Sequence, residues 1–115
     1  MEVGLNKIEN VTILSIKGRA DVSNAPKLES ACKKILEQNE KNIIIDGTQL
    51  DFISSAGLRV LLKLAKEIKK SAGRLAVAHV NDLVRNIFEI SGFVELFPIF
   101  DNVVKALSHF QDKSQ

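Results

Sequence analysis

Strand-like and helix-like segments alternate along this chain of 115 residues, and the alternation restricts the fold more than any other feature of the sequence. The order is strand, strand, helix, strand, helix, strand, helix, short strand, helix. Strands separated by helices need crossover connections, which predict a mostly parallel central sheet with helices packed on it. The first two strands follow one another directly, so we expect an antiparallel hairpin at one edge. The predicted fold class is α/β, in a single domain over residues 1–115.

Apolar and β-branched runs locate the expected strands. They cover residues 3–8, 11–17, 42–46 and 75–80, with one more short strand within residues 93–100. Gly18 is expected to end the second strand. The run from Ile43 to Ile45 is continuously apolar, which is typical of a strand buried on both faces.

Capping residues and a period of 3.6 locate the helices. We expect one from Ser23 or Asn24 to near Asn39, one that stops at Gly73, one from Asn81 to Ile90 and one from Asp101 onward. The apolar positions that should face inward are Leu58, Leu61, Leu62, Ala65, Ile68 and Ala72 in the second helix, Leu83, Val84, Ile87 and Phe88 in the third, and Val103, Val104 and Leu107 in the last.

The composition excludes several classes of protein. The single cysteine, Cys32, cannot form an internal disulfide, and His79 and His109 lie too far apart to suggest a metal site. No run approaches the roughly 20 apolar residues of a membrane span, and the first residues do not resemble a signal peptide. A net charge of +2 does not indicate direct binding to nucleic acid. We therefore expect a cytoplasmic protein without membrane insertion.

Catalytic and cofactor motifs are also missing, which indicates a binding module and not an enzyme. The glycines form neither a phosphate-binding loop nor a dinucleotide fingerprint, so no cofactor is expected. Cys32 lies on the apolar side of the first helix, where packing in the core is its expected role. Asp46 ends a buried strand, where a carboxylate can accept phosphate as in response-regulator receivers. Its simpler role is to accept hydrogen bonds from loop amides.

Two serines, Ser54 and Ser55, precede the second helix. A serine at this place can act as the N-cap, a contribution of ~1 kcal/mol. Alternatively its hydroxyl is exposed at a helix N-terminus, where free amides favour a phosphate. The small residues Ala56 and Gly57 would leave room for the active site of another protein.

Basic residues gather in the second helix, with six basic residues and one acidic residue between residues 59 and 74. Four of them share one helical face beside Val60 and Leu64, namely Arg59, Lys63, Lys66 and Lys70. This pattern fits either an ordinary solvated face beside a broad core stripe or a surface that docks an acidic partner, with Val60 and Leu64 as apolar contacts.

The central part of the sequence resembles the signature of STAS domains, specifically of bacterial anti-sigma factor antagonists. The similarity rests on Ile43-Ile-Ile-Asp46 and on Leu50-Asp-Phe-Ile-Ser-Ser-Ala-Gly-Leu-Arg-Val-Leu61. Gly18-Arg-Ala-Asp21 and Leu83-Val-Arg-Asn-Ile-Phe-Glu-Ile-Ser-Gly92 match as well, so the resemblance covers essentially the whole chain.

This resemblance implies a function in partner switching. The unphosphorylated antagonist would bind an anti-sigma factor that is also a serine kinase, and would thereby free a sigma factor for transcription. The kinase would use ATP to phosphorylate the antagonist, and a PP2C-type phosphatase would reset it. The phosphoacceptor falls on Ser55, with Asp21 as the acidic residue beside it. Many members carry Asp where this chain has Ser54, which makes Ser54 a second candidate acceptor.

The expected partner-binding surface consists of Asp21, Ser54, Ser55, Gly57, Arg59, Val60 and Lys63. Two alternatives to this function remain open. STAS domains also occur as accessory subunits of transporters and in stress-signalling scaffolds. A receiver-like phosphoacceptor domain would use Asp46 instead of a serine.

Overall fold

Strand β2 (Val11–Ala20) is the centre of the fold, because it pairs with three other strands. The computed structural model describes residues 1–111. Strand β1 (Glu2–Ile8) lies antiparallel to β2, and β3 (Asn42–Asp46) lies parallel to its first half. The sheet continues through β5 (Arg74–Ala78) to β6 (Ile99–Phe100), both parallel to their neighbours. The predicted α/β fold with an antiparallel hairpin at one edge is confirmed.

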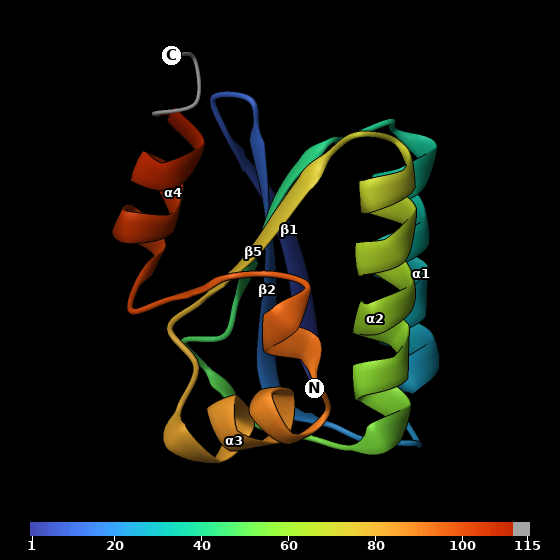
Figure 1. Ribbon diagram of the computed structural model, residues 1–115. Helices are drawn as coiled ribbons and strands as arrows, with labels where there is room; N and C mark the ends of the chain where they lie inside the picture. The colour runs from blue at the N-terminus through green and yellow to red at the C-terminus, as the bar shows by residue number, and fades with distance from the viewer. Residues whose placement is uncertain (112–115) are drawn as a thin grey trace.

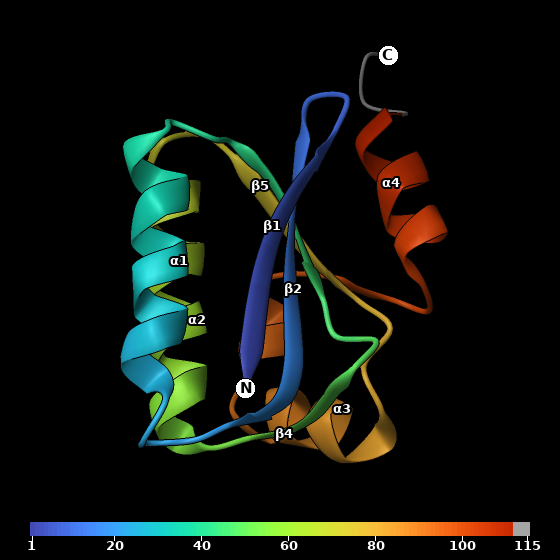
Figure 2. The same ribbon diagram turned by 180° about the vertical axis from the view of Figure 1, so that it is seen from behind.

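Two helices, α1 (Ala25–Glu37) and α2 (Ser55–Lys70), lie side by side on one face of the sheet (Figure 1). Helix α4 (Val103–Gln111) covers part of the opposite face (Figure 2). Helix α3 (Asp82–Ile90) lies at the end of the sheet where α2 begins, and a short 3₁₀ turn, Phe93–Glu95, follows α3 and contacts it. None of the helices described is long and apolar enough to cross a membrane.

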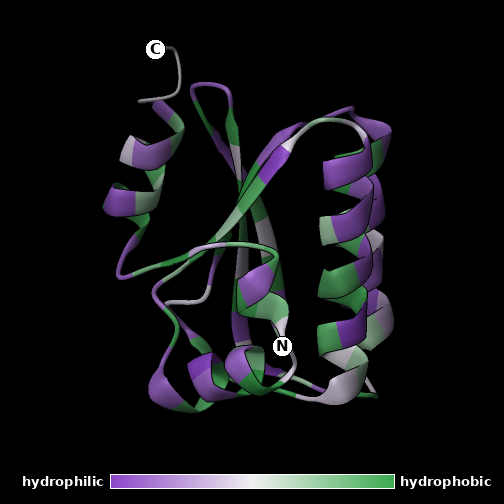
Figure 3. Ribbon diagram, in the orientation of Figure 1, coloured by the Kyte–Doolittle hydropathy of each residue, from purple (hydrophilic) through white to green (hydrophobic). Residues whose placement is uncertain are grey.

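The sheet separates two hydrophobic cores. Ile43 and Ile45 of β3 face the larger core beneath α1 and α2, whereas Ile44 faces the smaller core beneath α4. This two-sided burial explains the continuously apolar run in the sequence and confirms that prediction. Along α2, hydrophobic and hydrophilic residues alternate, as expected of a helix with one buried face (Figure 3).

Gly18 does not end the second strand, contrary to the sequence prediction. Its φ of 90° allows a shift in register between Gly18 and Arg19, after which β2 continues to Ala20. The extension pairs in parallel with β4 (Leu50–Ile53), a strand that the sequence analysis did not predict. The sheet therefore forks along β2, and the second branch leads directly into α2.

Several expected details of the helices are wrong. Leu83 is 52% exposed and Val104 is 71% exposed, because both lie on the outer sides of their helices. Ala72 lies beyond the end of α2 and is exposed. Asn102, and not Asp101, caps α4, since its Oδ1 accepts a hydrogen bond of 2.9 Å from the Lys105 amide. The predicted cap of α3 is confirmed, because Asn81 Oδ1 accepts from the Val84 amide at 2.8 Å.

Candidate functional site

Ser54 is the N-cap of α2. Its backbone is extended, with φ −86° and ψ 173°, and its Oγ accepts a hydrogen bond from the Gly57 amide at 3.3 Å. The Ser54 amide in turn donates to the carbonyl oxygen of Ala20 at 2.8 Å. The backbone of Ser54 therefore joins the end of β2 to the start of α2, and its half-buried side chain caps the helix.

Ser55 is the first residue of α2, and it is exposed. Because Ser54 performs the capping, the hydroxyl of Ser55 is not needed to begin the helix. Within residues 1–111 this hydroxyl has no hydrogen-bond partner. The structure thus separates the two roles that the sequence left open, and Ser55 is the serine accessible to another protein.

Gly57 is a buried residue in the first turn of α2. A Cβ at this position would be 3.0 Å from Ile53 Cγ1 and 3.1 Å from the carbonyl oxygen of Ala20. The missing side chain therefore lets α2 approach the ends of β2 and β4 closely. Gly57 therefore supports the expected docking surface through this close packing, and it is not itself exposed on that surface.

Asp21 begins the loop between β2 and α1, directly after Ala20. Its Oδ1 accepts hydrogen bonds from the Ser23 hydroxyl at 2.7 Å and from the Ser23 amide at 3.1 Å. The hydroxyl bond is the main reason that the pKa of Asp21 lies below its usual value. The Asp21 amide donates to Asn24 Oδ1 at 2.8 Å. A fixed carboxylate thus lies at the same end of the sheet as Ser55.

An aromatic contact strengthens the forked part of the sheet. The Arg19 guanidinium lies 4.5 Å above the centre of the Phe52 ring, across the pairing of β2 with β4. The sequence analysis did not find this contact, because it needs the strand that was missed. The guanidinium of Arg19 is therefore held against the Phe52 ring, near the start of α2.

The basic residues of α2 are exposed, but they are not equivalent. Lys63 forms an ion pair of 3.9 Å with Glu29 of α1, and Lys70 lies 3.8 Å from Glu67. Within the described part of the chain, Arg59 and Lys66 form no ion pair. The basic face therefore offers two cations without competing carboxylates.

The two apolar residues beside this face are less exposed than the sequence analysis assumed. Leu64 is only 1% exposed and belongs to the core, so its expected role as a surface contact is wrong. Val60 is half-buried and packs against that core. Of the two, only Val60 remains available as an apolar contact at the surface.

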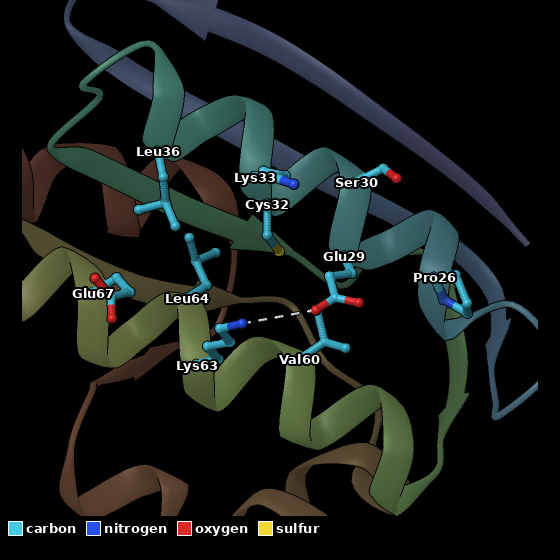
Figure 4. Close-up of a pocket in the computed structure, with 10 residues that line it drawn as sticks. All are labelled: Pro26, Glu29, Ser30, Cys32, Lys33, Leu36, Val60, Lys63, Leu64 and Glu67. Atoms are coloured by element: carbon cyan, nitrogen blue, oxygen red, sulfur yellow. Dashed lines mark ion pairs between the residues drawn. The ribbon is translucent and has the colours of Figure 1, made fainter.

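A groove of about 540 Å³ separates α1 from α2 (Figure 4). Its lining includes Cys32, Leu36, Val60 and Leu64, and the Lys63–Glu29 ion pair crosses it. Burial raises the pKa of the Cys32 thiol to about 12, so it remains protonated at neutral pH. This agrees with the packing role that the sequence predicted for Cys32.

Asp46 is engaged within its own loop. Its Oδ1 accepts from the Thr48 hydroxyl at 2.6 Å and from the Thr48 amide at 3.0 Å. These bonds confirm the simpler role that the sequence analysis gave to this carboxylate. Residues 1–111 hold no cluster of three His, Cys, Asp or Glu side chains that would bind a metal ion beside it.

Comparison with known proteins gives a consistent result. Residues 2–106 match the model of the family described as STAS domain. The chain is 34% identical over 111 residues to a Bordetella bronchiseptica protein named as a candidate anti-sigma factor antagonist, BtrV, covering 96% of each chain. It is 26% identical over 112 residues to the anti-sigma F factor antagonist of Paenibacillus polymyxa, again covering 96% of each.

The fold is similar to that of SpoIIAA, an anti-sigma factor antagonist from Bacillus. The unphosphorylated form of SpoIIAA superposes with a TM-score of 0.84 at 18% identity, covering 96% of this chain and 97% of that one. The phosphorylated form gives a TM-score of 0.76, covering 95% and 99%. At this identity the likeness supports the fold alone.

Proposed function

The chain belongs to the STAS domain family, and we propose that within it the protein acts as an anti-sigma factor antagonist. In its unphosphorylated form it binds an anti-sigma factor that is also a serine kinase, and this frees a sigma factor for transcription. The names of its relatives from Bordetella and Paenibacillus support this function.

One observation carries the proposal, namely the exposed hydroxyl of Ser55 beside a neighbouring serine that caps the helix. The kinase transfers a phosphoryl group to this hydroxyl. A bond forms between Ser55 Oγ and the γ-phosphorus of ATP, the bond from that phosphorus to the bridging oxygen breaks, and ADP leaves. The hydroxyl proton passes to a base of the kinase.

The PP2C-type phosphatase reverses the modification by hydrolysis. Water attacks the phosphorus, the bond to Ser55 Oγ breaks, and the products are the serine hydroxyl and inorganic phosphate. The chain itself supplies no catalytic group for either step. It presents Ser55 on a helix end that the Ser54 cap and the contact of Gly57 with Ala20 hold in place.

The docking surface for the kinase surrounds Ser55. Asp21 contributes a fixed carboxylate from the β2–α1 loop, and Arg59, Val60 and Lys63 contribute from the first turns of α2. The cations of α2 complement an acidic surface on the partner and speed association. Phosphorylation places a charge of roughly −2 inside this contact, where it meets no counter-charge from the partner.

Site mapping tests the proposal. The chain is incubated with the anti-sigma kinase of the same organism and ATP, and the products are analysed by peptide mass spectrometry. We expect an added mass of about 80 Da, one phosphoryl group, on Ser55. The label should remain in Ser54→Ala and vanish in Ser55→Ala. Label confined to Ser54, or label that persists in Ser55→Ala, would refute the assignment.

A further inference from the structure

We propose that Arg59 binds the phosphoryl group placed on Ser55, so that phosphorylation also withdraws Arg59 from the docking surface. This inference rests on the proposed function, because it needs a phosphate on Ser55. Phosphorylation would then have two effects. A negative charge appears on Ser55, and the positive charge of Arg59 is no longer free to meet the partner.

The spacing of the two residues on α2 carries the inference. Arg59 follows Ser55 by four positions in a helix that runs without interruption from Ser55 to Lys70. Residues four apart lie on the same side of a helix, with Cβ atoms about 5–6 Å from each other. Both side chains are exposed, so neither needs to leave a packed position to meet the other. An acidic group four residues before a basic one is also the favourable order of such a pair.

Among residues 1–111, two other cations in this part of the molecule already contact another side chain, whereas Arg59 does not. The Arg19 guanidinium lies 4.5 Å above the Phe52 ring, and Lys63 is paired with Glu29 at 3.9 Å. Arg59 has no ion pair and no contact with an aromatic ring among residues 1–111. Of the cations discussed, Arg59 is therefore the one that a phosphate on Ser55 can bind without displacing another contact.

The chemistry of the two groups suits this pairing. A guanidinium presents its N–H groups in a planar fork that binds two phosphate oxygens at once, whereas an ammonium acts as a point charge. Asp21 follows Ala20, whose carbonyl oxygen binds the Ser54 amide, and its carboxylate has the same sign of charge as the phosphate. This loop therefore offers the phosphate no cation that would compete with Arg59 at residue 21.

The test places phosphoserine at position 55 during synthesis of the full chain, so that no kinase is needed. The second pKa of the phosphate is then followed by phosphorus NMR in the otherwise unchanged chain and with Arg59→Gln, Arg59→Lys or Lys69→Gln. Lys69→Gln removes one positive charge from the same helix, more than three turns from Ser55. Thermal melting of each variant checks the fold.

We expect the phosphate pKa to rise by about 0.3 in Arg59→Gln, because a neighbouring cation favours the dianion. Arg59→Lys should give an intermediate value, and Lys69→Gln should leave it unchanged. An equal pKa with and without Arg59, or an equal rise in Lys69→Gln, would overturn the inference. Failure of the kinase to label Ser55 would instead overturn the proposed function, and the NMR result would remain interpretable.

Discussion

At the scale of single residues, Ser54 and Ser55 have different roles although they are neighbours of the same type. The sequence places both at the start of a helix but cannot decide which one is the cap. That choice depends on the extended backbone of Ser54, whose amide is held by the carbonyl of Ala20, more than thirty residues earlier. A pairing between distant segments therefore decides which hydroxyl is exposed.

Loss of the cap should weaken the fold. Ser54→Ala removes the acceptor for the Gly57 amide, and we expect the free energy of unfolding to fall by about 1 kcal/mol in urea titrations. Ser54→Asp should retain most of the stability, since aspartate is an equally good N-cap. Ser55→Ala is the matched control and should change stability little. An equal loss in Ser54→Ala and Ser55→Ala would contradict this assignment of the cap.

A negative charge at Ser55 should remove most of the affinity for the partner without unfolding the protein. In Ser55→Asp the carboxylate lies near free amides at the start of α2, which stabilises the helix by roughly 0.3–1 kcal/mol. In contact with the partner the same charge loses water without gaining a counter-charge, and this costs several kcal/mol. Calorimetric titration with the kinase should show a loss of at least about tenfold in affinity for Ser55→Asp, since each ~1.4 kcal/mol is a factor of ten.

Ser55→Ala provides the comparison, because it removes the acceptor without adding charge and should bind as the wild type does. Aspartate carries one charge where phosphate carries nearly two, so its effect is a lower bound. Normal affinity of a folded Ser55→Asp would show that charge at this position does not control binding.

A side chain at position 57 should destabilise the fold. In Gly57→Ala the new Cβ would contact Ile53 Cγ1 and the carbonyl oxygen of Ala20 at 3.0–3.1 Å. That oxygen is a backbone atom bound to the Ser54 amide, so it cannot easily move away. We expect a loss of about 1–3 kcal/mol in urea titrations, typical of overpacking, in spite of the better helix propensity of alanine. Ala56→Gly, one position earlier, is the control for helix propensity alone.

At the scale of elements, the sequence predicted four helices and all strands except β4. This strand has only four residues, and its partner is the part of β2 beyond Gly18. A glycine normally weakens a strand, so the sequence indicated an end at Gly18. The structure uses the positive φ of this glycine to shift the register and to continue the strand. Such a continuation depends on a partner strand thirty residues away, which local patterns do not reveal.

The basic face of α2 should control the rate at which the partner binds. Arg59→Glu combined with Lys66→Glu reverses two exposed charges and should slow association and reduce its dependence on salt, as measured by stopped flow. We prefer this pair to one with Lys63 or Lys70, because a glutamate at position 63 would also repel Glu29, and one at position 70 would repel Glu67.

The control for this experiment is Lys17→Glu combined with Lys34→Glu, which changes the net charge equally on β2 and α1. If both double variants slow association by the same factor, net charge and not the face of α2 is responsible.

The ion pair between Lys7 of β1 and Glu40 should make stability depend on pH. The Lys7 ammonium lies 2.9 Å from Glu40 Oε1 and is the main cause that lowers the pKa of Glu40. Because the pKa of Glu40 is lower in the folded state, the pair stabilises the fold at pH values above the unfolded pKa of about 4.3. This stabilisation is lost as the pH falls through the pKa of Glu40 in the folded state.

We therefore expect Lys7→Gln to unfold more easily than the wild type at pH 7, by roughly 0.5 kcal/mol, which is typical of a surface pair. The difference should disappear in acid below both pKa values of Glu40. Lys17→Gln serves as the control without an ion pair, and a difference for Lys7→Gln that is constant from pH 7 to pH 2 would refute this account.

At the scale of the whole molecule, the fold class and the family followed from the sequence, but the three-dimensional surroundings of Ser55 did not. The alternation of strands and helices and the motif around Ser55 were both visible in the sequence. The contact of Arg19 with Phe52 and the ion pair of Lys63 with Glu29 join segments that only the folded chain brings together. These contacts decide which cations near Ser55 remain free.

The fork of the sheet along β2 has a consequence for what the kinase can recognise. The surface around Ser55 is assembled from the end of β2, the loop before α1, β4 and the start of α2, and the first two are distant in sequence from the last two (Figure 2).

A synthetic peptide of residues 47–62 lacks the end of β2 and the loop before α1, and it is too short to form a stable helix in water. We expect the kcat/KM for its phosphorylation to be lower than that of the intact protein by on the order of 100-fold. This corresponds to a loss of about 2.8 kcal/mol, since each ~1.4 kcal/mol is a factor of ten. A peptide modified as fast as the protein would contradict this. Under the proposed function, the kinase would modify folded copies and not unfolded ones, and newly made chains would become substrates only after β2 has paired with β4.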